Sequence, residues 1–149
     1  MTTLFRTNSK NPDFIQLVKL LDLELAIADG EEHSFYKQFN KIDHIRYVVL
    51  AYEENKPIAC GAIKTFDSDT MEVKRMYVTE NRRGRGIAGK ILEELEKWAK
   101  ELGYRRCILE TGKRQEAAII LYKKSDYEII PNYGQYIGVE NSLCFEKMV

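Results

Sequence analysis

Hydrophobic positions recur along this chain with two different spacings, and the change between them predicts where its helices and strands lie. Helical spacing recurs in residues 31–41, in the strongly amphipathic segment 87–102 and in the shorter segment 115–125. It also marks the segment after Asn11-Pro12, where Asp13 is the expected N-cap and a helix ending near Gly30 carries Phe14, Leu17, Val18, Leu21 and Leu25 on one stripe.

Between these helices, runs rich in β-branched and aromatic residues predict strands. Turn-forming residues at 54–57 and 67–70 separate three of these runs, which we expect to form consecutive antiparallel strands. The following run is reached through helix 87–102, so it should lie parallel to the strand before that helix. The expected strands are residues 4–7, 46–53, 58–66, 71–78, 104–111, 127–130 and 143–148.

This order of elements predicts one α+β domain over residues 1–149, with a mixed, mostly antiparallel central sheet and helices on both faces. A hydrophobic content of 44% and a charged content of 31% are typical of a globular protein. No apolar stretch reaches the ~20 residues that a membrane-spanning helix needs, and the first residues lack the layout of a secretory signal. We therefore expect a cytoplasmic protein with no membrane partner.

The cysteines and histidines give no sign of a metal site. Cys60, Cys107 and Cys144 each lie in a mostly apolar run, which predicts buried free thiols. His33 and His44 have no cysteine near them in the sequence, so a zinc site is not expected.

The net charge is zero, but the charges are unevenly distributed. Residues 74–90 hold six basic residues and one acidic residue, whereas residues 13–43 hold seven acidic residues and three lysines. A neutral chain with one compact basic patch lacks the extended footprint of a nucleic-acid-binding protein. The basic cluster coincides with a glycine-rich turn, which favours a small polyanionic ligand.

That turn, residues 82–90 (Arg-Arg-Gly-Arg-Gly-Ile-Ala-Gly-Lys), joins a predicted strand to the start of the amphipathic helix. Glycines allow close approach of the backbone, and the unpaired N–H groups and dipole of a helix N-terminus attract phosphate. A Walker A loop would need Ser or Thr after Gly89-Lys90, where Ile91 stands. The string also fits G-x-G-x-x-G, but it follows several strands instead of opening a βαβ unit.

Arg83-x-x-Gly86-x-Ala88 resembles the Q/R-x-x-G-x-G/A signature of the GNAT superfamily of N-acetyltransferases, whose loop binds the pyrophosphate of acetyl-coenzyme A (acetyl-CoA). Residues 71–78 look like the family's fourth strand. Residues 115–122 look like its N-x-x-A-x-x-L-Y helix, with Gln115 in place of Asn, and Asp126 stands where the family usually has a glycine. The resemblance extends over residues 58–136.

The resemblance implies acetyl-CoA as co-substrate and no metal. It implies that backbone groups of Met76 and Val78 hold the pantetheine arm and that the Val78 N–H polarises the thioester carbonyl. Tyr122 corresponds to the family tyrosine that protonates the departing thiolate. The implied cofactor-binding residues are Met76, Tyr77, Val78, Arg83, Gly84, Arg85, Gly86, Ile87, Ala88, Gly89, Lys90 and Gln115.

An amine with a pKa near 10.4 must lose a proton before it can attack a thioester, directly or through water. Glu72 is the first candidate for this base, because some relatives carry a catalytic glutamate there; Glu110 is the second, and ordered water is the third. Strand alternation predicts Glu72 on one face with Lys74, Met76 and Val78. Tyr133 and Tyr136 are expected to form a wall of the acceptor pocket or to pack on the sheet edge.

These features predict an N-acetyltransferase that transfers acetyl from acetyl-CoA to a primary amine of a small molecule or peptide by direct attack. The alternative is a non-catalytic acyl-CoA-binding or sensor module. The acidic residues between Asp22 and Glu32 favour a cationic acceptor. Dimers are common in the family, so a homodimer is possible.

Overall fold

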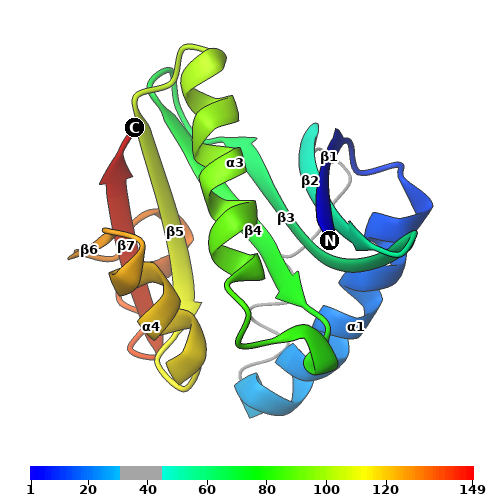
Figure 1. Ribbon diagram of the computed structural model, residues 1–149. Coiled ribbons are helices and arrows are strands. Elements are labelled where there is room, and N and C mark those ends of the chain that lie inside the picture. Colours follow the sequence, from blue (N-terminus) through cyan, green and yellow to red (C-terminus); the bar gives the residue numbers. More distant parts are fainter. Residues whose placement is uncertain (31–44) are drawn as a thin grey trace.

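The computed structural model describes residues 1–30 and 45–149. The predicted helix at residues 31–41 and both histidines lie outside the described residues. The described chain forms a seven-stranded sheet in the order β1-β2-β3-β4-β5-β7-β6 (Figure 1). Its strands are β1 (Thr2–Thr7), β2 (Tyr47–Glu53), β3 (Lys56–Thr65), β4 (Thr70–Val78), β5 (Arg106–Gly112), β6 (Glu128–Ile130) and β7 (Ser142–Met148).

The described helices are α1 (Pro12–Asp29), α3 (Ile87–Glu101) and α4 (Glu116–Lys124), with short 3-10 turns at Glu80–Arg82 and Gly134–Tyr136. All three helices and all seven strands begin and end within two residues of the predicted positions. One cap was predicted wrongly. Asn11, not Asp13, caps α1, because the Asn11 side chain accepts from the Asp13 N–H at 2.9 Å and Pro12 suits the first turn.

The sheet is antiparallel from β1 to β4, parallel between β4 and β5, and antiparallel again from β5 through β7 to β6. This confirms the predicted mixed, mostly antiparallel sheet. In Figure 1, α3 and α4 lie in front of the sheet. α1 packs its buried stripe on the opposite face, against β2, β3 and β4. Helices therefore cover both faces, as predicted.

The three cysteines are confirmed as buried free thiols. Cys60 on β3 and Cys107 on β5 belong to the cores on opposite faces of the sheet. Burial raises the pKa of each of these two thiols to about 12, so both stay protonated and unreactive at neutral pH.

A β-bulge interrupts β4 at Arg75, whose φ is +60°. Ala62 pairs with Lys74 and Cys60 pairs with Tyr77, so Arg75 and Met76 together oppose Gly61. The extra residue reverses the alternation of side chains in the second half of the strand.

The expectation that Glu72, Lys74, Met76 and Val78 share one face is therefore wrong. Met76 and Val78 pack with the core beneath α3, to which Met71 and Val73 also contribute. Alternation before the bulge then directs Glu72 and Lys74 to the face that α1 covers. The spacing of residues in the sequence does not mark the extra residue, so the bulge was not predicted.

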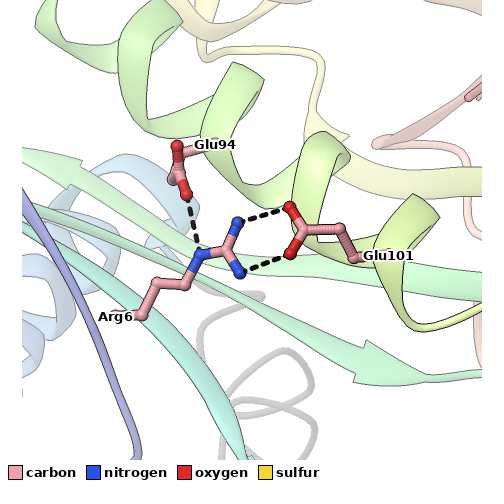
Figure 2. Close-up of polar contacts among 3 residues, drawn as sticks. All are labelled: Arg6, Glu94 and Glu101. Atoms are coloured by element: carbon pink, nitrogen blue, oxygen red, sulfur yellow. Dashed lines mark hydrogen bonds and ion pairs between the residues drawn. The ribbon is translucent and has the colours of Figure 1, made fainter.

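The edge strand β1 is fastened to α3 by an arginine. Figure 2 shows the Arg6 guanidinium bonded to Glu94 at 2.7 Å and to both oxygens of Glu101 at 2.9 and 3.0 Å. The same guanidinium lies 4.8 Å from the centre of the Trp98 ring. Bidentate pairing and cation–π contact together fix the end of α3 against the first strand.

Gly61 lets α3 approach the sheet at the bulge. A Cβ at this position would lie 2.5 Å from Met76 Sδ, 2.7 Å from Ile91 Cγ2 and 3.0 Å from Leu95 Cδ1.

Gly61→Ala should therefore lower the free energy of unfolding by about 1–3 kcal/mol, measured by urea denaturation, because this site is already filled. Gly89→Ala, whose Cβ would meet no atom within 4 Å, should not destabilise. Equal stability of the Gly61→Ala variant and the wild type would contradict the prediction.

Candidate active site

A cavity of about 650 Å³ opens where β4 and β5 separate. The two strands pair from Thr70–Arg106 to Glu72–Ile108, after which β4 continues to Val78 without β5 beside it. Figure 1 shows the strands diverging toward the bottom of the view, with α4 beside the gap. Residues from α1, β4, the 82–89 turn, the end of β5 and α4 line the cavity.

The backbone of β4 faces this cavity beyond the bulge. The Thr79 N–H donates to the Ile58 carbonyl of β3 at 2.9 Å. By alternation, the N–H and C=O groups of Met76 and Val78 point the other way, into the gap. The Arg83 Nε confirms this direction for Val78, because it reaches the Val78 carbonyl from the open side at 2.8 Å. An extended ligand could pair with this edge as another strand would.

The glycine-rich turn lies at one end of the cavity. Gly84 and Gly86 have φ of +79° and +77°, which only glycine adopts readily, and Gly86 is the N-cap of α3. The Lys90 N–H donates to the Gly86 carbonyl at 3.2 Å, so the N–H groups of the helical residues before Lys90 lie ahead of the intrahelical ladder. Together with the helix dipole they form an anion-binding end.

Carboxylates hold the arginines of the turn in place. Arg83 bonds Glu24 of α1 at 2.7 Å. Arg82 lies 3.0 Å and Arg85 3.6 Å from the same Glu53 oxygen. Arg83 and Arg85 keep 45% and 55% of their side-chain surface exposed, so both can still meet a charged ligand.

Most of the predicted cofactor-binding residues meet at this cavity. Arg85 and Lys90 are the two that do not line it, whereas Arg82, which was not predicted, does. Gln115, at the N-cap of α4, is among the lining residues and makes no side-chain cap bond. The residues predicted from the sequence that line the cavity are Met76, Tyr77, Val78, Arg83, Gly84, Gly86, Ile87, Ala88, Gly89 and Gln115.

Tyr122 lines the same cavity from α4 and is only 6% exposed. Its ring centre lies 5.9 Å from that of Tyr127 and 5.8 Å from that of Phe145. Burial, with a smaller contribution from the negative charge of Glu110, raises the pKa of the Tyr122 hydroxyl. The hydroxyl therefore keeps its proton at neutral pH and can donate it.

Both candidate bases line the cavity. Glu72 accepts a hydrogen bond from the Tyr133 hydroxyl at 2.6 Å, and the Lys74 Nζ lies 3.9 Å from its other oxygen. Glu110 accepts from the Ser142 hydroxyl at 2.7 Å. Burial lowers the pKa of Lys74, and the charges of Glu72 and Glu110 oppose that shift. Lys74 is a cavity residue that the sequence reasoning did not single out.

The two tyrosines predicted to form a wall have different positions. Tyr136 is buried and lines the cavity. Tyr133 is absent from the lining. Its hydroxyl instead donates to Glu72, and its ring packs against Phe66 and Tyr136. No sequence signal could have found the contact between Tyr133 and Glu72, which are far apart in the chain.

Two acidic residues of α1 pair with arginines. Asp22 bonds the buried Arg75, and Glu24 bonds Arg83. Glu31 and Glu32 lie outside the described residues. The carboxylates that line the cavity from the strands are those of Glu72 and Glu110.

Two kinds of feature, a membrane-spanning helix and a cluster of metal-ligating side chains, are absent from residues 1–30 and 45–149. No helix in these ranges is long and apolar enough to cross a membrane. No cluster of three or more His, Cys, Asp or Glu side chains in these ranges could hold a metal ion.

Comparison with known proteins gives a consistent result. Residues 14–127 match the acetyltransferase (GNAT) family. The chain is 30% identical over 148 residues to an IAA acetyltransferase of Azospirillum brasilense, which covers 97% of this chain and 96% of the relative.

Two solved structures share the fold. One is a protein of Klebsiella pneumoniae assigned as an acyl-CoA N-acyltransferase, with a TM-score of 0.83, 26% identity and coverage of 99% of this chain and 97% of that one. The other is a GNAT family acetyltransferase of Elizabethkingia anophelis with acetyl-CoA bound, with a TM-score of 0.72, 20% identity and coverage of 99% and 98%. The chain therefore belongs to the GNAT family of acetyltransferases, which are acyltransferase enzymes.

Proposed function

We propose that this protein is an N-acetyltransferase that transfers acetyl from acetyl-CoA to a primary amine of a small molecule or peptide by direct attack. One observation carries the proposal. A single cavity at the separation of β4 and β5 brings together an open backbone edge, an anion-binding helix end, a buried tyrosine and two carboxylates. Family membership and Tyr122 favour catalysis over a non-catalytic acyl-CoA-binding module.

The residues present fit acetyl-CoA. The pyrophosphate would bind the N–H groups at the start of α3, with Arg83 beside them, and the pantetheine arm would pair with the backbone groups of Met76 and Val78 that face the gap. Gln115 would contact the arm from α4. When bound, acetyl-CoA supplies the acetyl group as a thioester that an amine can attack.

The side chains supply the proton transfers. Glu72 would accept the proton of the attacking amine, directly or through one water, and Glu110 is the alternative acceptor. The Val78 N–H would polarise the acetyl carbonyl. Tyr122 would give its proton to the departing thiolate, and the raised pKa of its hydroxyl keeps that proton in place until the thiolate forms.

The acceptor is proposed to be cationic before it loses its proton. The part of the cavity lined by β4 before the bulge and by β5 holds two carboxylates, Glu72 and Glu110, and one ammonium, Lys74. These formal charges sum to a net negative charge, which attracts an ammonium group. A cytoplasmic location and a homodimer remain predictions from the sequence.

Acetyl-CoA should stabilise the native protein by about 2.7 kcal/mol at 100 times its dissociation constant, because it binds the folded state. A thermal-shift titration measures this. Gly86→Glu should abolish the shift, because it places a side chain and a negative charge at a residue with φ of +77° where the pyrophosphate belongs.

Gly103→Glu is the matched control. Gly103 also has a positive φ, +94°, but lies at the far end of α3 and does not line the cavity. This variant should lose some stability and keep the full acetyl-CoA shift. Loss of the shift in both variants, or in neither, would place the binding site elsewhere.

Tyr122→Phe should lower turnover by about 10–10³-fold and leave acetyl-CoA binding intact, because only the proton donor is lost. Thiol release with a panel of amines measures turnover, and the thermal shift measures binding. Tyr127→Phe removes a hydroxyl from the neighbouring buried ring, which does not line the cavity, and should turn over normally. A Tyr122→Phe enzyme as fast as wild type, with chemistry rate-limiting, would make Tyr122 structural.

Glu72→Gln should lower turnover by about 10²–10⁴-fold, leave acetyl-CoA affinity nearly unchanged and remove the acidic limb of the pH–rate profile. Glu110→Gln, measured in parallel, should have the smaller effect. A larger loss in Glu110→Gln would exchange the two roles. Near-normal turnover in both variants would indicate that ordered water carries the proton.

A further inference from the structure

The hydrogen bond between Tyr133 and Glu72 joins the candidate base to a residue outside the cavity. The Tyr133 hydroxyl donates to Glu72 Oε2 at 2.6 Å. Glu72 lines the cavity and Tyr133 does not, so the bond joins a cavity residue to one outside the lining.

The segment that carries Tyr133 is held by its own bonds. The Asn132 side-chain amide donates to the carbonyls of Tyr136 and Val139 at 3.1 and 3.0 Å, which closes the segment around the 3-10 turn Gly134–Tyr136. The Tyr133 ring meets Phe66 and Tyr136 edge to face, with centres 5.3 and 5.7 Å away. The hydroxyl is thus presented to Glu72 by a packed ring.

Both oxygens of Glu72 have a partner, since Lys74 Nζ lies 3.9 Å from Oε1. Burial, together with the adjacent charge of Glu72, raises the pKa of the Tyr133 hydroxyl far above neutrality. Tyr133 is therefore a permanent donor in this pair, and a donor favours the ionised form of the carboxylate it contacts. Within residues 1–30 and 45–149, the titratable and charged groups around Glu72 are Lys64, Lys74, Glu110, Tyr133, Tyr136 and Cys144.

We propose that Tyr133 is a positioning residue for the reaction: its hydroxyl holds the Glu72 carboxylate in the orientation from which it can take the amine proton. The inference rests on the proposed function, with Glu72 as base. It adds that Tyr133, a residue of the β6–β7 connection that does not line the cavity, influences how the rate depends on pH.

The test is Tyr133→Phe, which keeps the ring packing on Phe66 and Tyr136 and removes only the hydroxyl. The acidic limb of the kcat/KM profile should move toward neutral pH by about one unit, because the carboxylate loses a donor that favours its ionised form. The rate on that limb should fall about 10-fold, whereas acetyl-CoA affinity stays unchanged. In the Glu72→Gln background, Tyr133→Phe should have no further effect.

Tyr52→Phe is the matched control. Tyr52 also donates to a carboxylate at 2.6 Å, that of Asp13, but joins β2 to α1 away from the cavity. Loss of the Tyr52 hydroxyl should lower the free energy of unfolding and leave the pH–rate profile unchanged.

The outcomes distinguish failure of the role proposed for Tyr133 from failure of the proposed function. An unmoved limb in Tyr133→Phe, or an equal loss of rate with and without Glu72, overturns the inference while wild-type acetylation keeps the proposed function. Wild-type protein that releases no thiol with any amine overturns the proposed function and, with it, this inference. A moved limb that depends on Glu72 supports both.

Discussion

Strands β4 and β5 pair for three residues and then separate, and every part of the proposed site depends on that separation. In a continuous sheet, the N–H and C=O groups of β4 would be hydrogen-bonded to the neighbouring strand. Here Met76 and Val78 turn theirs toward a cavity, with α3 and α4 covering one face of the gap and α1 the other. The gap lets a ligand take the place of a strand while the other strands of the sheet stay paired.

The bulge at Arg75 decides which side chains accompany that backbone edge. It sends Met76 and Val78 into the core beneath α3 and leaves Glu72 and Lys74 on the opposite face, so apolar anchors and charged groups come from the same strand. Arg75 itself is buried and bonds Asp22, so the bulge is tied to α1. One extra residue thus separates the half of β4 proposed to hold the cofactor arm from the half that carries the candidate base.

Charge pairing accounts for two of the acidic residues on which the expectation of a cationic acceptor was based. The acids of α1 that the structure describes near the cavity bond arginines, and Glu53 bonds the arginines of the glycine-rich turn. These pairs fix the walls of the site. The carboxylates proposed to attract the acceptor, Glu72 and Glu110, lie in strands, where the local net charge of the sequence does not reveal them.

The sequence by itself determined the order of the described elements, their limits to within two residues, and the glycine-rich turn before α3, because each depends on local periodicity, turn chemistry or glycine placement. It also indicated Tyr122 and the carboxylates, and the structure brings these to one cavity. The separation of β4 from β5, the bulge at Arg75 and the bond between Tyr133 and Glu72 were decided only by the tertiary structure. These features arise from packing between residues distant in the chain, which no local pattern records.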